Sequence, residues 1–161
     1  MRQTLIAMLL VAATMSLMAV DAFAGNAHFI KNATDVTLSG SNLIVNFKET
    51  GLQSGSVETI TVSAQGMAIY RCYTKSGNKP EASNKTGLVP VSASGTFTAD
   101  KNGNLVGNLT LSPPGPEGFS CPPGQILQLD SVTYTDVMIM DTTSGATLAL
   151  SGTFIYTRPG S

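Results

Sequence analysis

The chain has 161 residues, with nine basic and ten acidic side chains, one histidine, two cysteines and no tryptophan. This near-neutral charge contains no run of like charges, which excludes the basic stripe typical of nucleic-acid-binding proteins and the basic amphipathic helix of membrane-surface proteins. The length after removal of an export segment suits one domain with a buried core.

The first 24 residues (1–24) have the features of a signal peptide. Arg2 supplies a positive start, residues 5–20 are almost entirely apolar, and the sequence AFA at 22–24 gives the small-x-small pattern that signal peptidase reads. The apolar stretch is shorter than the roughly 20 residues that a membrane-spanning helix needs. We therefore expect cleavage near Ala24 and a secreted or periplasmic domain of residues 25–161, with no membrane span.

The remaining chain is rich in Thr, Ser, Gly, Asn and Val and has no long stretch of helical periodicity, so we predict an all-β domain. We expect short early strands at 28–30 and 36–38. Apolar and polar side chains then alternate along residues 42–48, which predicts a half-buried strand. Residues 58–64 and 67–74 alternate in the same way on either side of Gly66, and we interpret these two segments as a hairpin.

A second hairpin is predicted by the alternating segments 91–99 and 105–111. Asn102 and Gly103 lie between them, and both residue types tolerate the positive φ angles of a type I′ turn. The sequence therefore predicts that these two strands pair directly with each other.

The apolar phase changes within residues 126–141. Val132 and Tyr134 share one parity while Val137 and Ile139 share the other, which indicates a β-bulge near Thr135 and Asp136 or a strand buried on both faces. A turn at 142–145 then leads to a last strand at 146–156. In total we predict a single antiparallel β-sandwich, immunoglobulin-like in architecture, with about seven to nine strands.

Cys72 and Cys121 are the only cysteines, with 48 residues between them. In an exported protein such a pair predicts a structural disulfide. A metal-binding or redox-active pair is the alternative, but the C-x-x-C spacing is missing and His28 alone cannot complete a zinc site.

Five of the eight prolines flank Cys121. They make this segment a stiff connection between strands that has few backbone hydrogen-bond donors. Because loops on a rigid scaffold often carry recognition, we take it as a candidate interaction loop. Its candidate residues are Pro113, Pro114, Pro116, Glu117, Phe119, Pro122 and Pro123.

The sequence offers few side chains suited to catalysis, so we expect that the protein is not an enzyme and binds no cofactor and no metal. A catalytic triad needs a histidine, and His28 lies close to the start of the mature chain. The spacing of the carboxylates does not select a pair for glycoside hydrolysis. Residues 100–104 begin like a calcium-binding EF-hand loop, but the glycine falls at position 4 instead of 6 and Leu111 stands where a glutamate is needed. The carboxylates considered for glycoside hydrolysis are Glu49, Glu58, Asp130, Asp136 and Asp141.

Four segments together resemble a family of small secreted proteins of bacteria and some fungi that has no assigned activity. These segments are HFI at 28–30, NLIVNFKE at 42–49, NKT at 84–86 and FSCPPGQ at 119–125. The resemblance covers most of the mature domain and implies secretion and a β scaffold. It transfers no catalytic residue.

The sequence is compatible with three functions. The first is a secreted, non-enzymatic domain with a binding or cell-surface structural role, acting on an extracellular or cell-envelope partner through the proline-rich loop. The second is a chaperone-assembled pilin subunit, which accepts a strand from its neighbour. The third is a secreted protease inhibitor that presents the disulfide-held loop.

Overall fold

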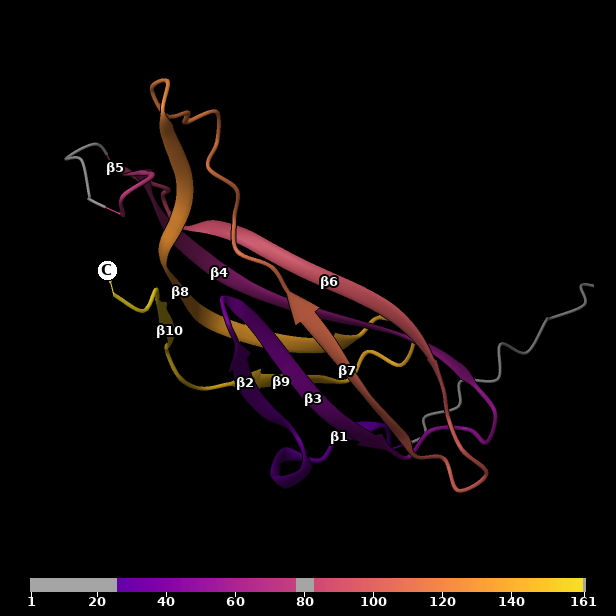
Figure 1. The fold of residues 1–161 in the computed structure, drawn as a ribbon. Helices are drawn as coiled ribbons and strands as arrows, with labels where there is room; N and C mark the ends of the chain where they lie inside the picture. Colours follow the sequence, from indigo (N-terminus) through magenta and orange to yellow (C-terminus); the bar gives the residue numbers. More distant parts are fainter. Residues whose placement is uncertain (1–25, 78–82, 161) are drawn as a thin grey trace, which may run out of the picture.

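The computed structural model describes residues 26–77 and 83–160 (Figure 1). The predicted signal peptide lies outside the described residues. Two antiparallel sheets pack against each other, which confirms the all-β sandwich. The described chain forms ten strands, several of them only two to four residues long, and one turn of 3-10 helix, η1 (Lys31–Ala33).

The smaller sheet is built around β3. One side of β3 pairs with two short strands in succession, and the other side pairs with β7. Its members are β1 (His28–Phe29), β2 (Asp35–Ser39), β3 (Asn42–Thr50) and β7 (Leu105–Leu111).

The larger sheet is built around two long strands, β4 and β8, which pair with each other along most of their length. β5 and β6 pair with the free side of β4, and β9 and β10 pair with the free side of β8. Its members are β4 (Val57–Thr74), β5 (Ser83–Lys85), β6 (Val89–Thr98), β8 (Gln125–Asp141), β9 (Thr147–Leu150) and β10 (Phe154–Thr157).

The order of the strands is immunoglobulin-like. The chain crosses between the sheets after β3, β6 and β7, so that one sheet has the order β2-β3-β7 and the other β6-β4-β8-β9. This corresponds to the A, B and E strands facing the C′, C, F and G strands of immunoglobulin-type sandwiches. The predicted architecture is therefore confirmed.

The core lies between the two sheets and follows the period-two alternation of the strands. Phe47 is at its centre and meets two other aromatic rings edge-on, Phe97 at 5.2 Å and Phe29 at 6.1 Å between ring centroids. Gly107 lies against these rings, because a Cβ atom there would be 2.5 Å from Phe97. The fully buried apolar side chains include Leu43, Val45, Ile60, Val62, Val132, Tyr134 and Ile139.

The first predicted hairpin is wrong. Residues 58–64 and 67–74 are parts of one continuous strand, β4, and Gly66 lies inside it. The glycine does not form a turn. It lets Pro114 pack closely against the strand, since a Cβ atom on Gly66 would lie 3.1 Å from Cδ of Pro114. The alternation on either side of Gly66 keeps the same parity, as one strand requires.

The second predicted hairpin is also wrong. β6 pairs with β4 and β7 pairs with β3, so the connection at 99–104 crosses from one sheet to the other. Gly103 has a positive φ of 72° but Asn102 does not, which excludes a type I′ turn. The Asp100 carboxylate organises the connection instead by accepting hydrogen bonds from the backbone N–H groups of Asn102 and Asn104.

The β-bulge in β8 is confirmed. The pairing of β8 with β4 shifts between Ser63 and Gln65, and Asp136 on the opposite strand has a left-handed φ of 52°. The bulge changes the parity of the buried residues, so Val137 points into the core as Tyr134 does. The predicted last strand at 146–156 divides into β9 and β10, which are separated at residues 151–153.

Candidate functional site

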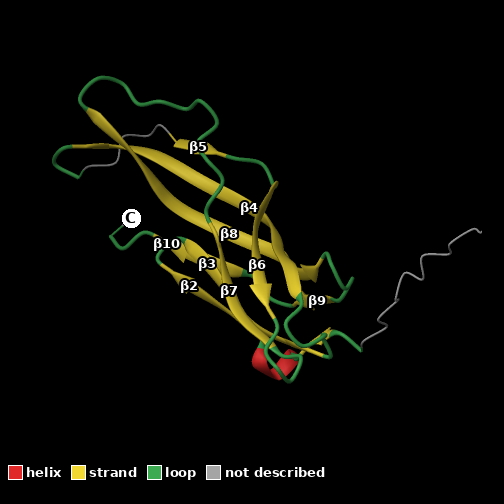
Figure 2. Ribbon diagram, turned by 90° about the vertical axis from the view of Figure 1, so that its right-hand side faces the viewer, coloured by secondary structure: helices red, strands yellow, loops and turns green. Residues whose placement is uncertain are grey.

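The distal halves of β4 and β8 extend past the smaller sheet (Figures 1 and 2). We call this extension, residues 67–74 paired with 125–133, the arm. Its inner face continues the side of the larger sheet that faces the core. Here the partner layer is the connection from β7 to β8, residues 112–124, which we call the proline loop.

Pro114 anchors the proline loop to the inner face of the arm. It is buried, and its ring lies over Gly66. Its carbonyl oxygen accepts a hydrogen bond of 2.7 Å from the hydroxyl of Tyr70, and burial raises the pKa of this tyrosine. A proline suits a loop packed on a strand because it brings no backbone N–H that would need a partner.

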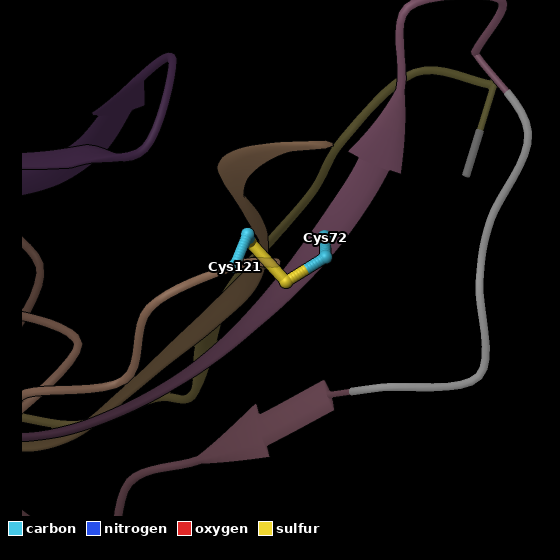
Figure 3. Close-up of a disulfide and its surroundings, with 2 residues drawn as sticks. All are labelled: Cys72 and Cys121. Atoms are coloured by element: carbon cyan, nitrogen blue, oxygen red, sulfur yellow. A yellow bond between two sulfur atoms is a disulfide. The ribbon is translucent and has the colours of Figure 1, made fainter. Parts of the chain in front are cut away.

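The disulfide between Cys72 and Cys121 joins the loop to the arm covalently (Figure 3). Cys72 is fully buried in β4, Cys121 is half-buried in the loop, and their Cα atoms are 5.6 Å apart. The predicted disulfide is thus confirmed. A disulfide is typical of an extracellular or periplasmic environment.

Two tight turns shape the outer part of the loop. In the first, the N–H of Phe119 donates to the carbonyl of Pro116, with positive φ at both Glu117 (46°) and Gly118 (83°), as in a type I′ turn. Because Glu117 is not a glycine, this conformation is strained by about 1 kcal/mol.

In the second turn, the N–H of Gln125 donates to the carbonyl of Pro122, and Gly124 has a φ of 86°. A proline followed by a glycine with positive φ gives a type II turn. Both turns therefore fix the exposed parts of the loop by local hydrogen bonds.

The predicted loop residues separate into an anchor and a surface. Pro114 is buried and holds the loop in place, so it is not a contact residue. Glu117, Pro122 and Pro123 are exposed, whereas Pro113, Pro116 and Phe119 are half-buried. The exposed surface is concentrated at the two turns.

The outer face of the arm carries a polar network that was not predicted from the sequence. Asp130 accepts a hydrogen bond from Tyr73 and forms an ion pair of 2.8 Å with Nε of Arg71. The backbone N–H of Arg158 donates to the Asp130 carbonyl, and its guanidinium lies 4.3 Å from the centre of the Tyr73 ring. The network ties the C-terminal segment to the arm. Arg71 and Tyr73 are two residues apart in the strand, but their common partner is 57 or more residues away and left no local signal in the sequence.

Three of the five carboxylates considered lie together at the other end of the sandwich. Glu49 is the second-last residue of β3, Glu58 is the second residue of β4 and Asp141 is the last residue of β8, and all three are buried. Each has one oxygen bonded to a nearby donor, from Ser144, Ser56 and the N–H of Thr143. The second oxygen of each is buried without a hydrogen-bond donor. Asp130 and Asp136 lie elsewhere in the fold.

Burial and the neighbouring Asp141 raise the pKa of Glu49 to about 7, with a smaller contribution from Glu58. A protonated Glu49 can donate to Asp141, which explains how the pair stays buried. Since Glu49 and Asp141 are fully shielded from solvent, a substrate has no direct access to them.

His28 is exposed on the short strand β1. In residues 26–77 and 83–160, no group of three or more His, Cys, Asp or Glu side chains is arranged to hold a metal ion. The Asp100 carboxylate is engaged by two backbone N–H groups, and these hydrogen bonds lower its pKa.

No protein-family model matches this chain, and no curated protein shows a significant sequence match to it. Among the described residues, no helix has the length and apolar character needed to span a membrane.

Proposed function

We propose that this is an exported, non-enzymatic β-sandwich domain that binds an extracellular or cell-envelope partner through the exposed turns of the proline loop. One observation carries the proposal. The loop is fastened to the arm by a disulfide, by the Tyr70 hydrogen bond and by the packing of Pro114, while its turns stay exposed.

Such a loop can bind with little loss of conformational freedom, because most of its ordering is already achieved in the free protein. Proline, phenylalanine and a single carboxylate at the turns offer apolar contact with one charged group. A non-enzymatic role is supported by the position of Glu49 and Asp141, which are buried instead of lining a cleft. The resemblance to small secreted proteins stays a prediction and agrees with this role.

The pilin and protease-inhibitor alternatives find less support. A pilin subunit lacks a strand and accepts one from its neighbour. In this chain the positions beside the central strand β8 are filled, because β4 pairs with one side of it and β9 and β10 pair with the other. A protease inhibitor presents an extended segment to the enzyme. The proline loop instead closes into two tight turns at 116–119 and 122–125.

The test replaces the exposed Glu117 and the half-buried Phe119 of the first turn by serine and keeps Gly118. It measures retention of envelope and extracellular fractions from exporting cells on the immobilised mature domain. We expect the variant to lose the components that the wild-type domain retains. A matched control replaces Val106, which is exposed on β7, by serine and should retain them. Equal retention by all three proteins would contradict the proposal.

A further inference from the structure

Strand β6 has one side without a partner among the described residues. Its ten residues pair with β4 in one uninterrupted register from Val57 opposite Thr98 to Gly66 opposite Val89. No described strand pairs with its other side. An edge of this kind presents a row of backbone N–H and C=O groups to whatever lies beside it.

The direction of these backbone groups follows from the end of the strand. Ala99 donates its N–H to Ser56 and accepts from Gly55, so residue 99 faces the β4 side. Hydrogen bonds alternate along an antiparallel ladder, so the odd-numbered residues of β6 face β4 and the even-numbered ones face outward. Pro90 agrees with this assignment, since its missing N–H then falls on the free side.

The edge lacks most of the usual protection against strand pairing. β6 carries no charged residue, and its register shows no bulge. On the opposite edge of the same sheet, β9 and β10 are four residues each and are interrupted at 151–153. Short or broken edges discourage pairing, whereas a long, uncharged one favours it.

We propose that β6 pairs antiparallel with β6 of a second copy of this chain, about a twofold axis at Ser94. In this register Ser94 faces Ser94 of the copy and Ser92 faces Thr96, all on the outer face. Ala93 faces Gly95 on the inner face. The register keeps each side chain on its own face of the sheet, as pairing across a continuous sheet requires.

A second copy is the occupant that the sequence of the strand fits. In a twofold pairing every charge near the axis would lie close to its own like charge, and β6 has none. Apart from Pro90 at one end, the side chains on the outer face of β6 carry hydroxyls, which form favourable cross-strand pairs. Thr61 and Ser94 already form such a pair, with their oxygens 2.7 Å apart. The dimer would extend this row of hydroxyls across the axis.

The first test is a disulfide cross-link. Ser94→Cys places two thiols in directly opposed positions, about 5.5 Å apart between Cα atoms, which suits a disulfide. We expect rapid formation of a covalent dimer on mild oxidation. Pro90→Cys is the control, because its two copies would lie eight residues apart, about 27 Å. Cross-linking of Ser94→Cys no faster than that of Pro90→Cys would overturn the proposal.

The second test measures self-association by sedimentation equilibrium. The wild-type protein should show a concentration-dependent dimer, and Ser94→Lys should weaken it by about tenfold or more, because it places like charges opposite each other. Thr133→Lys, on the same face of the central strand β8, should leave it unchanged. A wild-type protein that stays monomeric, or a Ser94→Lys dimer of undiminished affinity, would refute the pairing.

Discussion

The hydroxyl of Tyr70 donates a hydrogen bond to the carbonyl oxygen of Pro114, 2.7 Å away, and joins the arm to the proline loop 44 residues later. Removing it by Tyr70→Phe should lower the free energy of unfolding by about 1 kcal/mol. It should also speed amide hydrogen exchange at Phe119 and Gln125, whose N–H groups form the two turns. Urea denaturation and exchange detected by mass spectrometry check both effects.

Tyr134→Phe is the control for this prediction. Its hydroxyl donates a comparable bond of 2.8 Å to the carbonyl of Ser41, in the turn between β2 and β3. This variant should lose similar stability without a selective effect on exchange at residues 112–124. The anchoring role of Tyr70 would be refuted if both variants changed loop exchange equally.

The disulfide should stabilise the domain without being required for the fold. The core between the sheets is built from residues other than the two cysteines. We expect the double variant Cys72→Ala and Cys121→Ser to retain its far-ultraviolet circular dichroism and to lose about 4 kcal/mol of unfolding free energy, because a closed loop of this length restricts the unfolded chain. An unchanged midpoint of denaturation would contradict this.

Gly107 should be intolerant of any side chain. A Cβ atom there would lie 2.5 Å from the Phe97 ring and 2.9 Å from the Phe47 ring, both within the packed interior. Gly107→Ala should therefore destabilise the domain by roughly 1–3 kcal/mol. Gly115→Ala provides the comparison, since a Cβ atom at Gly115 meets nothing within 4 Å. Thermal denaturation of the two variants should differ clearly, and equal midpoints would count against the described packing.

Glu49 should make stability depend on pH. Its pKa is about 7 in the folded protein and near 4.5 as a free side chain, so the folded state holds more protons between these values. Stability from this group therefore falls as the pH rises through that window and is level above it. At pH 8 the contribution of Glu49 to the free energy of unfolding is roughly 3 kcal/mol lower than at a pH below 4.5, where the side chain is protonated in both states. The carboxylates facing Glu49 are Asp141 and Glu58.

Glu49→Gln removes this titration, so its stability relative to wild type should increase from pH 4.5 to pH 7 and then stay constant. Denaturation at several pH values measures the difference. Glu117→Gln removes the same charge from an exposed turn and serves as the control. If the difference in unfolding free energy between Glu49→Gln and wild type does not vary with pH, Glu49 does not have the raised pKa described here.

Local patterns in the sequence predicted the bulge in β8 and the position of most strand segments, because alternation reports directly which face of a strand is buried, but they missed β5 and did not predict the division of the last strand into β9 and β10. They failed at Gly66 and at Gly103. Glycine in a strand can signal a turn or the close approach of another segment, and only the position of Pro114 distinguishes these at Gly66. Similarly, an Asn-Gly pair marks a change of direction without showing which sheet the next strand joins.

The candidate site was predictable in part for the same reason. The prolines and the cysteine pair identified the loop, but the burial of Pro114 depends on Tyr70, which lies far away in the sequence. The cluster of Glu49, Glu58 and Asp141 arises from three strand ends of two sheets. No spacing along the chain encodes that meeting.

Photo-cross-linking tests the central claim, that the proline loop carries recognition. A benzophenone side chain would replace Phe119 on the loop or, as the control, Val106 on β7, in cells that export the full-length chain. After irradiation, the loop position should give a cross-linked product other than a second copy of the chain, and the control position should not. No product from position 119, or equal products from both positions, would contradict the account.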